Sequence, residues 1–447
     1  MRDLKKLFKE YISDISGVNA LVFAIVLPAM VAAGGLAVDL ANAYNVKNRL
    51  GNALDKTALA TANSSGTEAE LTEIAQKFFA VNFRESGLGQ AYDLNVQFND
   101  KVIQVSASAD VELMFMGMFG KEDLNVSAMS EVTRELSGIE VVLVLDVTGS
   151  MAGSNITALK SASTEFLNIM FEDINDPEYI RIGITPYSNT INVGSYGWGE
   201  YPDGSYYGPA FIDLPETDDY KTASEITYDL ENTHDWHGCV LAGEYPDDVS
   251  DERVSFDMYR YPRVCQSGWY GYCWSYNNNP NNACTTSPVV PLGHDRVLLQ
   301  DTIDNLDPVG NTLGNFGLLW GWRLISPEEP FTEGAAYDDP EWKKAVIMMT
   351  DGVNTMNNTY SAYGRTADHD VRPSDLDDRL GEICMAMKDK NITVYTITFG
   401  NVNESTQDIY RECASTESLY KHVENDSELE ELFKSIANQL SRLHLSK

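Results

Sequence analysis

The chain has 447 residues, which is enough for two or three domains at about 150 residues each. Hydrophobic residues make up 43% and aromatic residues 10%, so the chain can build a packed core and wholesale disorder is excluded. With 32 Lys and Arg against 67 Asp and Glu, the formal charge of −35 argues against nucleic acid as the main partner, because phosphate binding needs clustered basic residues.

An apolar segment near the N-terminus predicts a membrane helix. Residues 15–38 carry no charged side chain, and a run of this length can cross a bilayer core of about 30 Å. Four basic residues precede the segment and the next three lie well beyond it: Arg2, Lys5, Lys6, Lys9, Lys47, Arg49 and Lys56. This asymmetry predicts that residues 1–40 form a cytoplasmic tail and a single membrane span.

Cleavage of the apolar segment is the alternative to a retained anchor. Small residues at Ala41-Asn42-Ala43 would suit a signal peptidase, but the apolar part of a signal peptide is usually only about 7–15 residues long. A cut after Gly17, as in pilin-like precursors, is also open. Val22 then occupies the place where pilins carry a glutamate.

All of the cysteines follow the apolar segment. They are Cys239, Cys265, Cys273, Cys284, Cys384 and Cys413. An even number on one side of a membrane predicts disulfides in an oxidising compartment rather than free thiols. Cys384 and Cys413 flank a predicted strand, which favours a clamp between them, whereas the other four allow three pairings that the sequence leaves open.

Residues 41–136 predict a small α+β stalk module. Alanine-rich helical spacing continues from the apolar segment over 41–62, and a second helix is expected over 68–82. Alternating apolar and polar residues then predict three strands, at Leu94–Ala107, Asp110–Met116 and Leu124–Val132.

Residues 137–447 change to an alternation of strands and helices, which predicts an α/β domain with a doubly wound, mostly parallel sheet. Strands are expected at 139–146, 179–187, 344–350 and 392–400. Helices are expected at 154–171, 295–306, 312–324, 374–389 and 427–444. About a hundred residues, 190–288, interrupt this pattern with Gly, Tyr, Trp, Pro and Asn and with four of the cysteines, so we expect a long functional insertion there.

Hydroxyl and carboxyl side chains gather at the predicted carboxyl ends of the strands, where open α/β sheets form their ligand sites. The candidates are Asp146, Thr148, Ser150, Thr312 and Asp351. The first three follow one strand at alternate positions, Thr312 precedes a helix, and Asp351 follows another strand. All are hard oxygen ligands, which predicts Mg²⁺, with Mn²⁺ or Ca²⁺ as alternatives. Neutral hydroxyls beside two carboxylates would leave room for a ligand from outside, most naturally a carboxylate of a protein partner.

These residues resemble the metal-ion-dependent adhesion site (MIDAS) of the von Willebrand factor A fold. The D-x-S-x-S motif of that family matches Asp146, Thr148 and Ser150, with Thr148 in place of the usual serine. The family's separate threonine matches Thr312, and its later aspartate matches Asp351. The resemblance implies that the hydroxyls bind the metal directly and that the aspartates act partly through water.

A narrower resemblance is to the TadG-like proteins of tight-adherence (Flp) pilus systems. It rests on G-V-N-A-L-V-F-A-I-V-L-P-A-M near the N-terminus, on P-L-G-H-D-R and G-L-L-W-G-W-R-L-I-S-P, and on E-C-A-S near the end. The resemblance implies an inner-membrane protein of a Gram-negative bacterium, with most of the chain periplasmic or surface-exposed, that supports pilus assembly or adhesion together with other pilus components. It also implies the pairing of Cys384 with Cys413.

The insertion contains an aromatic cluster that could form a rim for partner binding, or instead its own small core. The rim candidates are Trp269, Tyr270, Tyr272 and Trp274. A second metal at His234, His237 and Cys239 is a weaker alternative to a disulfide beside surface histidines. We expect the acidic run from Asp247 to Glu252 to be solvated.

The function predicted from these features is metal-dependent binding of a protein partner. A structural pilus scaffold, in which the metal only stabilises the fold, is the main alternative. We expect no enzymatic activity, because no H-E-x-x-H motif or other general base accompanies the predicted metal site.

Overall fold

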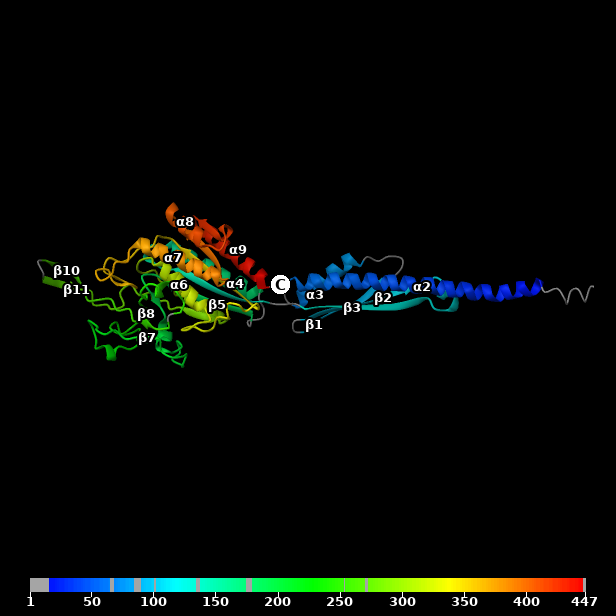
Figure 1. The fold of residues 1–447 in the computed structure, drawn as a ribbon, viewed down its shortest axis with the longest axis horizontal. Helices are drawn as coiled ribbons and strands as arrows, with labels where there is room; N and C mark the ends of the chain where they lie inside the picture. The colour runs from blue at the N-terminus through cyan, green and yellow to red at the C-terminus, as the bar shows by residue number, and fades with distance from the viewer. Residues whose placement is uncertain are drawn as a thin grey trace, which may run out of the picture. The chain divides into compact units, whose positions relative to one another are not determined.

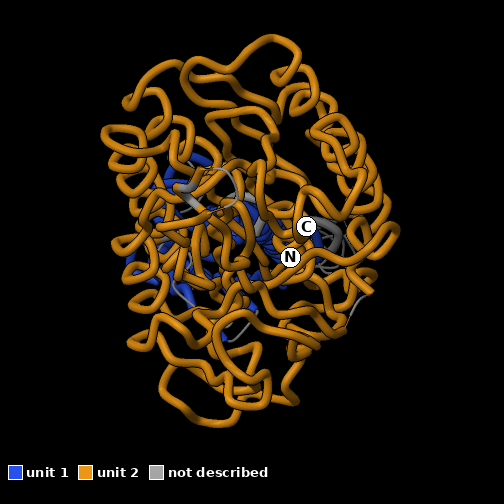
Figure 2. The backbone as a smooth tube through the Cα atoms, turned by 90° about the vertical axis from the view of Figure 1, so that its left-hand side faces the viewer, with its two compact units in different colours: residues 1–135 blue, residues 136–447 orange. Residues whose placement is uncertain are grey.

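The computed structural model describes residues 16–64, 68–83, 90–99, 102–133, 137–173, 179–252, 254–269 and 272–444. The chain divides into two compact units, residues 1–135 and 136–447, coloured blue and orange in Figure 2. Each unit has its own hydrophobic core, and the two are described separately.

Unit 1 is built on one long helix, α2 (Ser16–Ala62), which joins the predicted membrane segment and the first stalk helix without a break. It packs with α3 (Glu68–Asn82) and with an antiparallel sheet. The strands of that sheet are β1 (Gln90–Asn99), β2 (Val102–Glu112) and β3 (Asp123–Thr133). Alternate residues of β2 are buried, which is the period-2 pattern expected of a sheet with one covered face.

The first two predicted stalk strands have the wrong boundaries. The chain reverses inside the predicted strand Leu94–Ala107, because Asn99 at the end of β1 pairs with Val102 at the start of β2. The second predicted strand, Asp110–Met116, is the end of β2 followed by a 3₁₀ turn, η1 (Met116–Phe119). Apolar and polar residues alternate on both sides of the reversal, so the alternation alone does not mark where one strand ends and the next begins.

Unit 2 is built on an eight-stranded sheet within the described residues, with the strand order β17-β16-β13-β4-β5-β6-β8 and with β12 also paired to β5. The five strands from β17 to β5 are parallel, and β6, β8 and β12 join antiparallel. The bounds are β4 Gly138–Asp146, β5 Ile180–Tyr187, β6 Ile191–Asn192, β8 Cys239–Val240, β12 Val290–Gly293, β13 Trp342–Thr350, β16 Thr393–Phe399 and β17 Tyr420–Val423.

Helices cover both faces of this sheet (Figure 1). One face packs against α4 (Ser154–Asp173), α5 (Arg296–Asp304) and α9 (Asp426–His444). The other packs against α6 (Gly314–Ile325), α7 (Pro373–Asp389) and α8 (Glu404–Cys413). Every residue of β4 is buried, as expected for a strand with helices on both sides.

The insertion contains only short elements. Besides β6 and β8, they are η4 Gly194–Trp198, β7 Ile212–Asp213, η5 Ala223–Glu225, η6 Asp247–Val249, β9 Phe256–Asp257 and the hairpin β10 Cys265–Trp269 with β11 Tyr272–Tyr276. After β13 a further small pair, β14 Tyr360–Ser361 and β15 Gly364–Arg365, lies against it. Disulfides join Cys239 to Cys284 and Cys265 to Cys273, and the third bridge is Cys384–Cys413.

Candidate metal centre

The candidate ligands come from three segments that meet at the carboxyl ends of β4 and β13. Asp146 ends β4, Asp351 directly follows β13, and Thr312 lies just before α6. Backbone hydrogen bonds hold the loops together, from Val309 N to Val147 O at 2.8 Å and from Gly149 N to Gly310 O at 3.0 Å. The strand order places β4 beside β13, so the two carboxylates share one sheet edge.

The five predicted side chains form a connected set. Thr148 Oγ1 lies 2.9 Å from Ser150 Oγ and 3.4 Å from Thr312 Oγ1. Ser150 Oγ donates to Asp351 Oδ1 at 2.6 Å. Asp146 Oδ1 accepts from the backbone N–H of Thr148 at 2.9 Å, which ties the first carboxylate to the same turn.

The set is buried on one side and open on the other. Asp146, Thr148 and Thr312 are at most 5% exposed, whereas Ser150 is exposed and Asp351 is half-buried. A ligand from outside could therefore approach past Ser150 and Asp351, but Asp146 would be reached only from within the site.

Two further residues fix Asp146, and the sequence analysis did not identify them. Its Oδ2 accepts from Thr350 Oγ1 at 2.8 Å and from the Tyr187 hydroxyl at 3.2 Å. Both side chains belong to strand ends at the same sheet edge, Tyr187 in β5 and Thr350 in β13. Thr350 precedes the predicted ligand Asp351 in the sequence, so its neighbour indicates that it lies near the site. No sequence pattern indicates that Tyr187 contacts Asp146.

Burial, and after it the nearby charge of Asp351, raise the pKa of Asp146 to about 6, although hydrogen bonds from Thr148 and Thr350 oppose the shift. Burial also raises the pKa of Asp351, although hydrogen bonds from Ser150 and Asn155 oppose that shift. A divalent cation would stabilise the charged forms of a buried and a half-buried carboxylate that lie this close together. The donor chemistry and the electrostatics therefore both fit a hard cation.

The position of Thr312 depends on the segment after Asp351. Thr355 donates its backbone N–H to Thr312 O at 2.8 Å, and its hydroxyl accepts from Thr312 N at 3.3 Å. Asn354 Oδ1 accepts from Gly314 N at 2.8 Å at the start of α6. The loop after β13 therefore carries Asp351 and also fixes the position of Thr312.

The two residues that lead into the insertion, Ser188 and Asn189, are bonded to segments at the same edge. Leu313 N donates to Ser188 O at 3.3 Å, and Asn189 Nδ2 donates to Tyr360 O at 3.0 Å. A Cβ at Gly310 would lie 3.4 Å from the Cβ of Ala283, so the end of the insertion lies against the loop that precedes Thr312.

The aromatic residues of the insertion divide between the two predicted roles. Tyr261 and Trp236 are buried in its core, but the β10–β11 hairpin exposes three of the rim candidates, Trp269 at 74%, Tyr272 at 81% and Trp274 at 69%. Tyr270, the fourth, lies outside the described residues. The hairpin extends away from the rest of unit 2 at the left of Figure 1.

The prediction that the acidic run 247–252 is solvated is wrong for two of its members. Asp248 pairs with Arg379 at 2.6 Å and accepts from Tyr363 at 3.0 Å, and Asp251 Oδ2 accepts from Ser326 Oγ at 2.7 Å. Both carboxylates are buried, because partners distant in the sequence meet them.

The alternative of a second metal site at His234, His237 and Cys239 is not supported. Cys239 is bonded to Cys284, so its sulfur is not a thiolate ligand, and the part of the chain that the structure describes contains no group of three or more His, Cys, Asp or Glu that could hold a metal. The five-residue centre has only two such residues and depends on hydroxyls.

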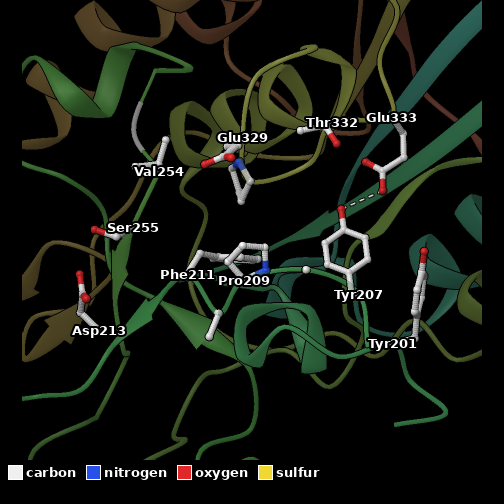
Figure 3. Close-up of a pocket in the computed structure, with 13 residues that line it drawn as sticks. Tyr201, Tyr207, Pro209, Phe211, Asp213, Val254, Ser255, Glu329, Thr332 and Glu333 are labelled. Atoms are coloured by element: carbon white, nitrogen blue, oxygen red, sulfur yellow. Dashed lines mark hydrogen bonds between the residues drawn. The ribbon is translucent and has the colours of Figure 1, made fainter. Parts of the chain in front are cut away.

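A cavity of about 560 Å³ lies elsewhere in unit 2, between the insertion and the segment 329–333 (Figure 3). In it the Tyr207 hydroxyl donates to Glu333 Oε1 at 2.8 Å. Burial raises the pKa of Glu333. None of the five candidate ligands lines this cavity, so it is separate from the candidate metal centre.

Residues 17–64 match a family model described as putative Flp pilus-assembly TadE/G-like. This match confirms the predicted resemblance over the N-terminal segment, which lies within α2 and the two residues after it. No curated protein matches the chain in sequence.

Several solved structures are similar to the chain. The pilus adhesin SpaC of Lactobacillus rhamnosus GG has 12% identity and a TM-score of 0.38, covering 79% of this chain and 34% of its own. The chain thus spans about a third of SpaC. The vWF domain of the type V pili tip protein Mfa5 of Porphyromonas gingivalis has 11% identity and a TM-score of 0.37, covering 68% of this chain and 95% of its own.

Proximal thread matrix protein 1 of the mussel byssus, described with a zinc-occupied MIDAS motif, has 13% identity and a TM-score of 0.32, covering 70% of this chain and 47% of its own. Likeness at these TM-scores carries no argument about function, so the assignment of the site rests on its own geometry.

Proposed function

We propose that the chain is a membrane-anchored component of a tight-adherence (Flp) pilus system in a Gram-negative bacterium. The family match over residues 17–64 supports the pilus context, and α2 is long and apolar enough to cross a membrane. In this proposal the N-terminus is cytoplasmic, α2 is a single inner-membrane span, and unit 2 is periplasmic or surface-exposed. The three disulfides favour that oxidising side of the membrane.

Unit 2 binds one divalent cation in this proposal, with Mg²⁺ preferred and Mn²⁺ or Ca²⁺ as alternatives. The observation that carries the proposal is the connected set of three hydroxyls and two carboxylates at one sheet edge, joined by contacts of 2.6 to 3.4 Å. The ligands are Asp146, Thr148, Ser150, Thr312 and Asp351. The metal would supply an open coordination position, and the exposed side of the site would admit a carboxylate from a protein partner.

The role is one of binding rather than catalysis. The exposed aromatic side chains of the β10–β11 hairpin would add contact area for the partner, since Trp and Tyr bury large surfaces with little loss of conformational freedom. Cation and hairpin together would then determine which partner binds.

A structural scaffold is the second candidate, and one observation favours it. Asp146 is wholly buried and is held by Tyr187 and Thr350, as in a site that stabilises a sheet edge. In that case the metal would stabilise unit 2, and the stalk and α2 would perform the essential role in pilus assembly.

Replacement of Asp146 and Thr312 by alanine in the source bacterium separates the two candidates. Loss of surface attachment with pili intact would support adhesion, whereas loss of pili would support the scaffold. Attachment that survives in a correctly exported double variant would refute metal-dependent adhesion. Asp301→Ala, which removes an exposed carboxylate in α5 away from the site, is the matched control and should behave like wild type.

A further inference from the structure

Unit 1 contains a buried carboxylate with an unusual set of partners. Asp39, in α2, is 1% exposed and accepts three backbone hydrogen bonds from the turn between β2 and β3. Met114 N donates to its Oδ1 at 3.0 Å, while Phe115 N and Met116 N donate to its Oδ2 at 3.0 and 2.8 Å. We call residues 113–120 the β2–β3 tip.

The tip lies directly against the helix one turn before Asp39. A Cβ at Gly35 would lie 2.5 Å from the Cβ of Phe115, so a side chain at this position would push the tip away. Gly35 and Asp39 are four residues apart and therefore lie on the same face of α2. Gly35 leaves room for the tip, and the Asp39 carboxylate in the next turn binds it. Together they fix the position of the tip along the axis of α2.

The β2–β3 tip and α2 both change from apolar to charged sequence near the point where they contact each other. The tip has the sequence L-M-F-M-G-M-F-G and is bounded by Glu112 and Lys121, and α2 has no charged residue from Ser16 to Val38. Met114 is 72% exposed, and the apolar residues of α2 up to Leu40 are mostly exposed as well. In Figure 1 the tip lies beside α2 part-way along it, and the helix continues beyond the tip toward residue 16.

We propose that the β2–β3 tip is a second membrane-contacting element, which enters the lipid interface beside α2 and fixes how deeply the helix is inserted. This inference rests on the proposed anchoring of the chain by α2. Its partner is the lipid surface at the carboxyl-terminal end of the apolar run.

The hydrogen bonds of Asp39 explain how such a turn can enter lipid. Unsatisfied backbone N–H groups and an isolated carboxylate are both costly in an apolar medium. Here each satisfies the other, and Gly120 N and Lys121 N also donate to carbonyls within the tip, at 3.1 and 3.2 Å. The tip therefore presents the apolar side chain of Met114 outward, while the backbone N–H groups of residues 114–116 are paired with Asp39 within unit 1.

A protein neighbour is the competing occupant of the tip. Lipid is favoured because the exposed Met114 belongs to a turn that contacts α2 at Gly35, within the exposed apolar part of that helix, and because charged residues begin on both sides of the tip. For a loop that binds protein, nothing requires its apolar sequence to end at the same position along α2 as the apolar sequence of the helix itself.

Depth-dependent fluorescence quenching tests the proposal on the full chain in vesicles of phosphatidylcholine and phosphatidylglycerol. A thiol-reactive fluorophore is placed at Met114→Cys without reductant, so that the three disulfides stay closed. The matched control is Met129→Cys, another exposed methionine, six residues along β3 from Asp123 and so about 20 Å from the tip. A label at Phe23→Cys, within the apolar run, reports insertion of α2 itself.

Lipids spin-labelled near the headgroup should quench the Met114 label several-fold more than the Met129 label, and Asp39→Ala should reduce that difference. Lipids spin-labelled within the acyl chains should still quench the Phe23 label in that variant, because α2 remains inserted. Quenching of Phe23 without extra quenching of Met114 would overturn the inference but leave the anchor intact. Failure to quench Phe23 would refute the anchor and the inference together. A Met114 label shielded from water but not quenched by lipid would assign the tip to a protein contact and also overturn the inference.

Discussion

Two apolar helices of this chain have opposite surroundings. The first part of α2, residues 21–40, exposes most of its large apolar side chains, whereas all twelve residues of α6 are buried. Both are nearly free of charge, since the only charged residue in α6 is Arg323. Hydrophobicity alone therefore does not decide whether a helix faces lipid or a protein core.

The difference lies in what approaches each helix. In α6 a Cβ at Gly317 would lie 2.4 Å from Cγ of Tyr187, and one at Gly321 would lie 2.3 Å from Cγ2 of Val144. The helix therefore fits against β5 and β4 at its glycines. At Gly34 in α2 no atom lies within 4 Å of the corresponding position, and only the tip at Gly35 comes close.

The largest effect expected from this comparison comes from leucine truncation. Leu319→Ala in α6 removes a fully buried side chain and should lower the unfolding free energy of unit 2 by about 2–5 kcal/mol. All 7 tryptophans lie in unit 2, so their fluorescence during denaturant unfolding in detergent reports this unit alone. Leu27→Ala, at an exposed site in α2, should leave that transition unchanged; equal effects would contradict the contrast between the helices.

The contact between Asp39 and the tip should give the next largest effect. Asp39→Ala removes a charged acceptor shared by three N–H groups, and the free energy of opening the tip should fall by about 1.5–3 kcal/mol in total. Hydrogen exchange at Met114, Phe115 and Met116 should accelerate accordingly, while amides of β2 near Val105 keep their protection. Unchanged exchange at the tip would show that the carboxylate does not hold it.

Glycine substitution should give a smaller effect whose sign differs between the helices. Gly317→Ala should destabilise unit 2 by about 1–3 kcal/mol through overpacking against Tyr187. Gly51→Ala in α2, where no atom lies within 4 Å, should stabilise the helix by about 0.5–1 kcal/mol. Tryptophan fluorescence measures the first and hydrogen exchange of the stalk the second; stabilisation by Gly317→Ala would refute the close approach.

The sequence was sufficient to predict the strands and helices that bear the candidate centre. Residues 139–146 and 344–350 are short apolar runs followed by hydroxyl and carboxyl groups, and such runs are local signals. The structure brings Asp146, Thr148, Ser150, Thr312 and Asp351 together because parallel neighbouring strands end at one edge.

Other features depend on contacts that no local pattern reveals. Asp248 is buried because Arg379 comes from a helix far along the chain, and Tyr187 reaches Asp146 only after β5 pairs with β4. The carboxylate of Asp39 likewise meets backbone groups more than seventy residues away. The four insertion cysteines allowed three pairings, and the fold of the insertion selects one of them.

Titration calorimetry of Mg²⁺ into the full chain, freed of metal by a chelator and held in detergent, tests the central claim most directly. We predict one saturable site in wild type and in Asp301→Ala, and none in the variant with Asp146→Ala and Thr312→Ala. At a hundred times its dissociation constant the ion should stabilise unit 2 by about 2.7 kcal/mol. No saturable binding to wild type, or equal binding to the double variant, would contradict the account.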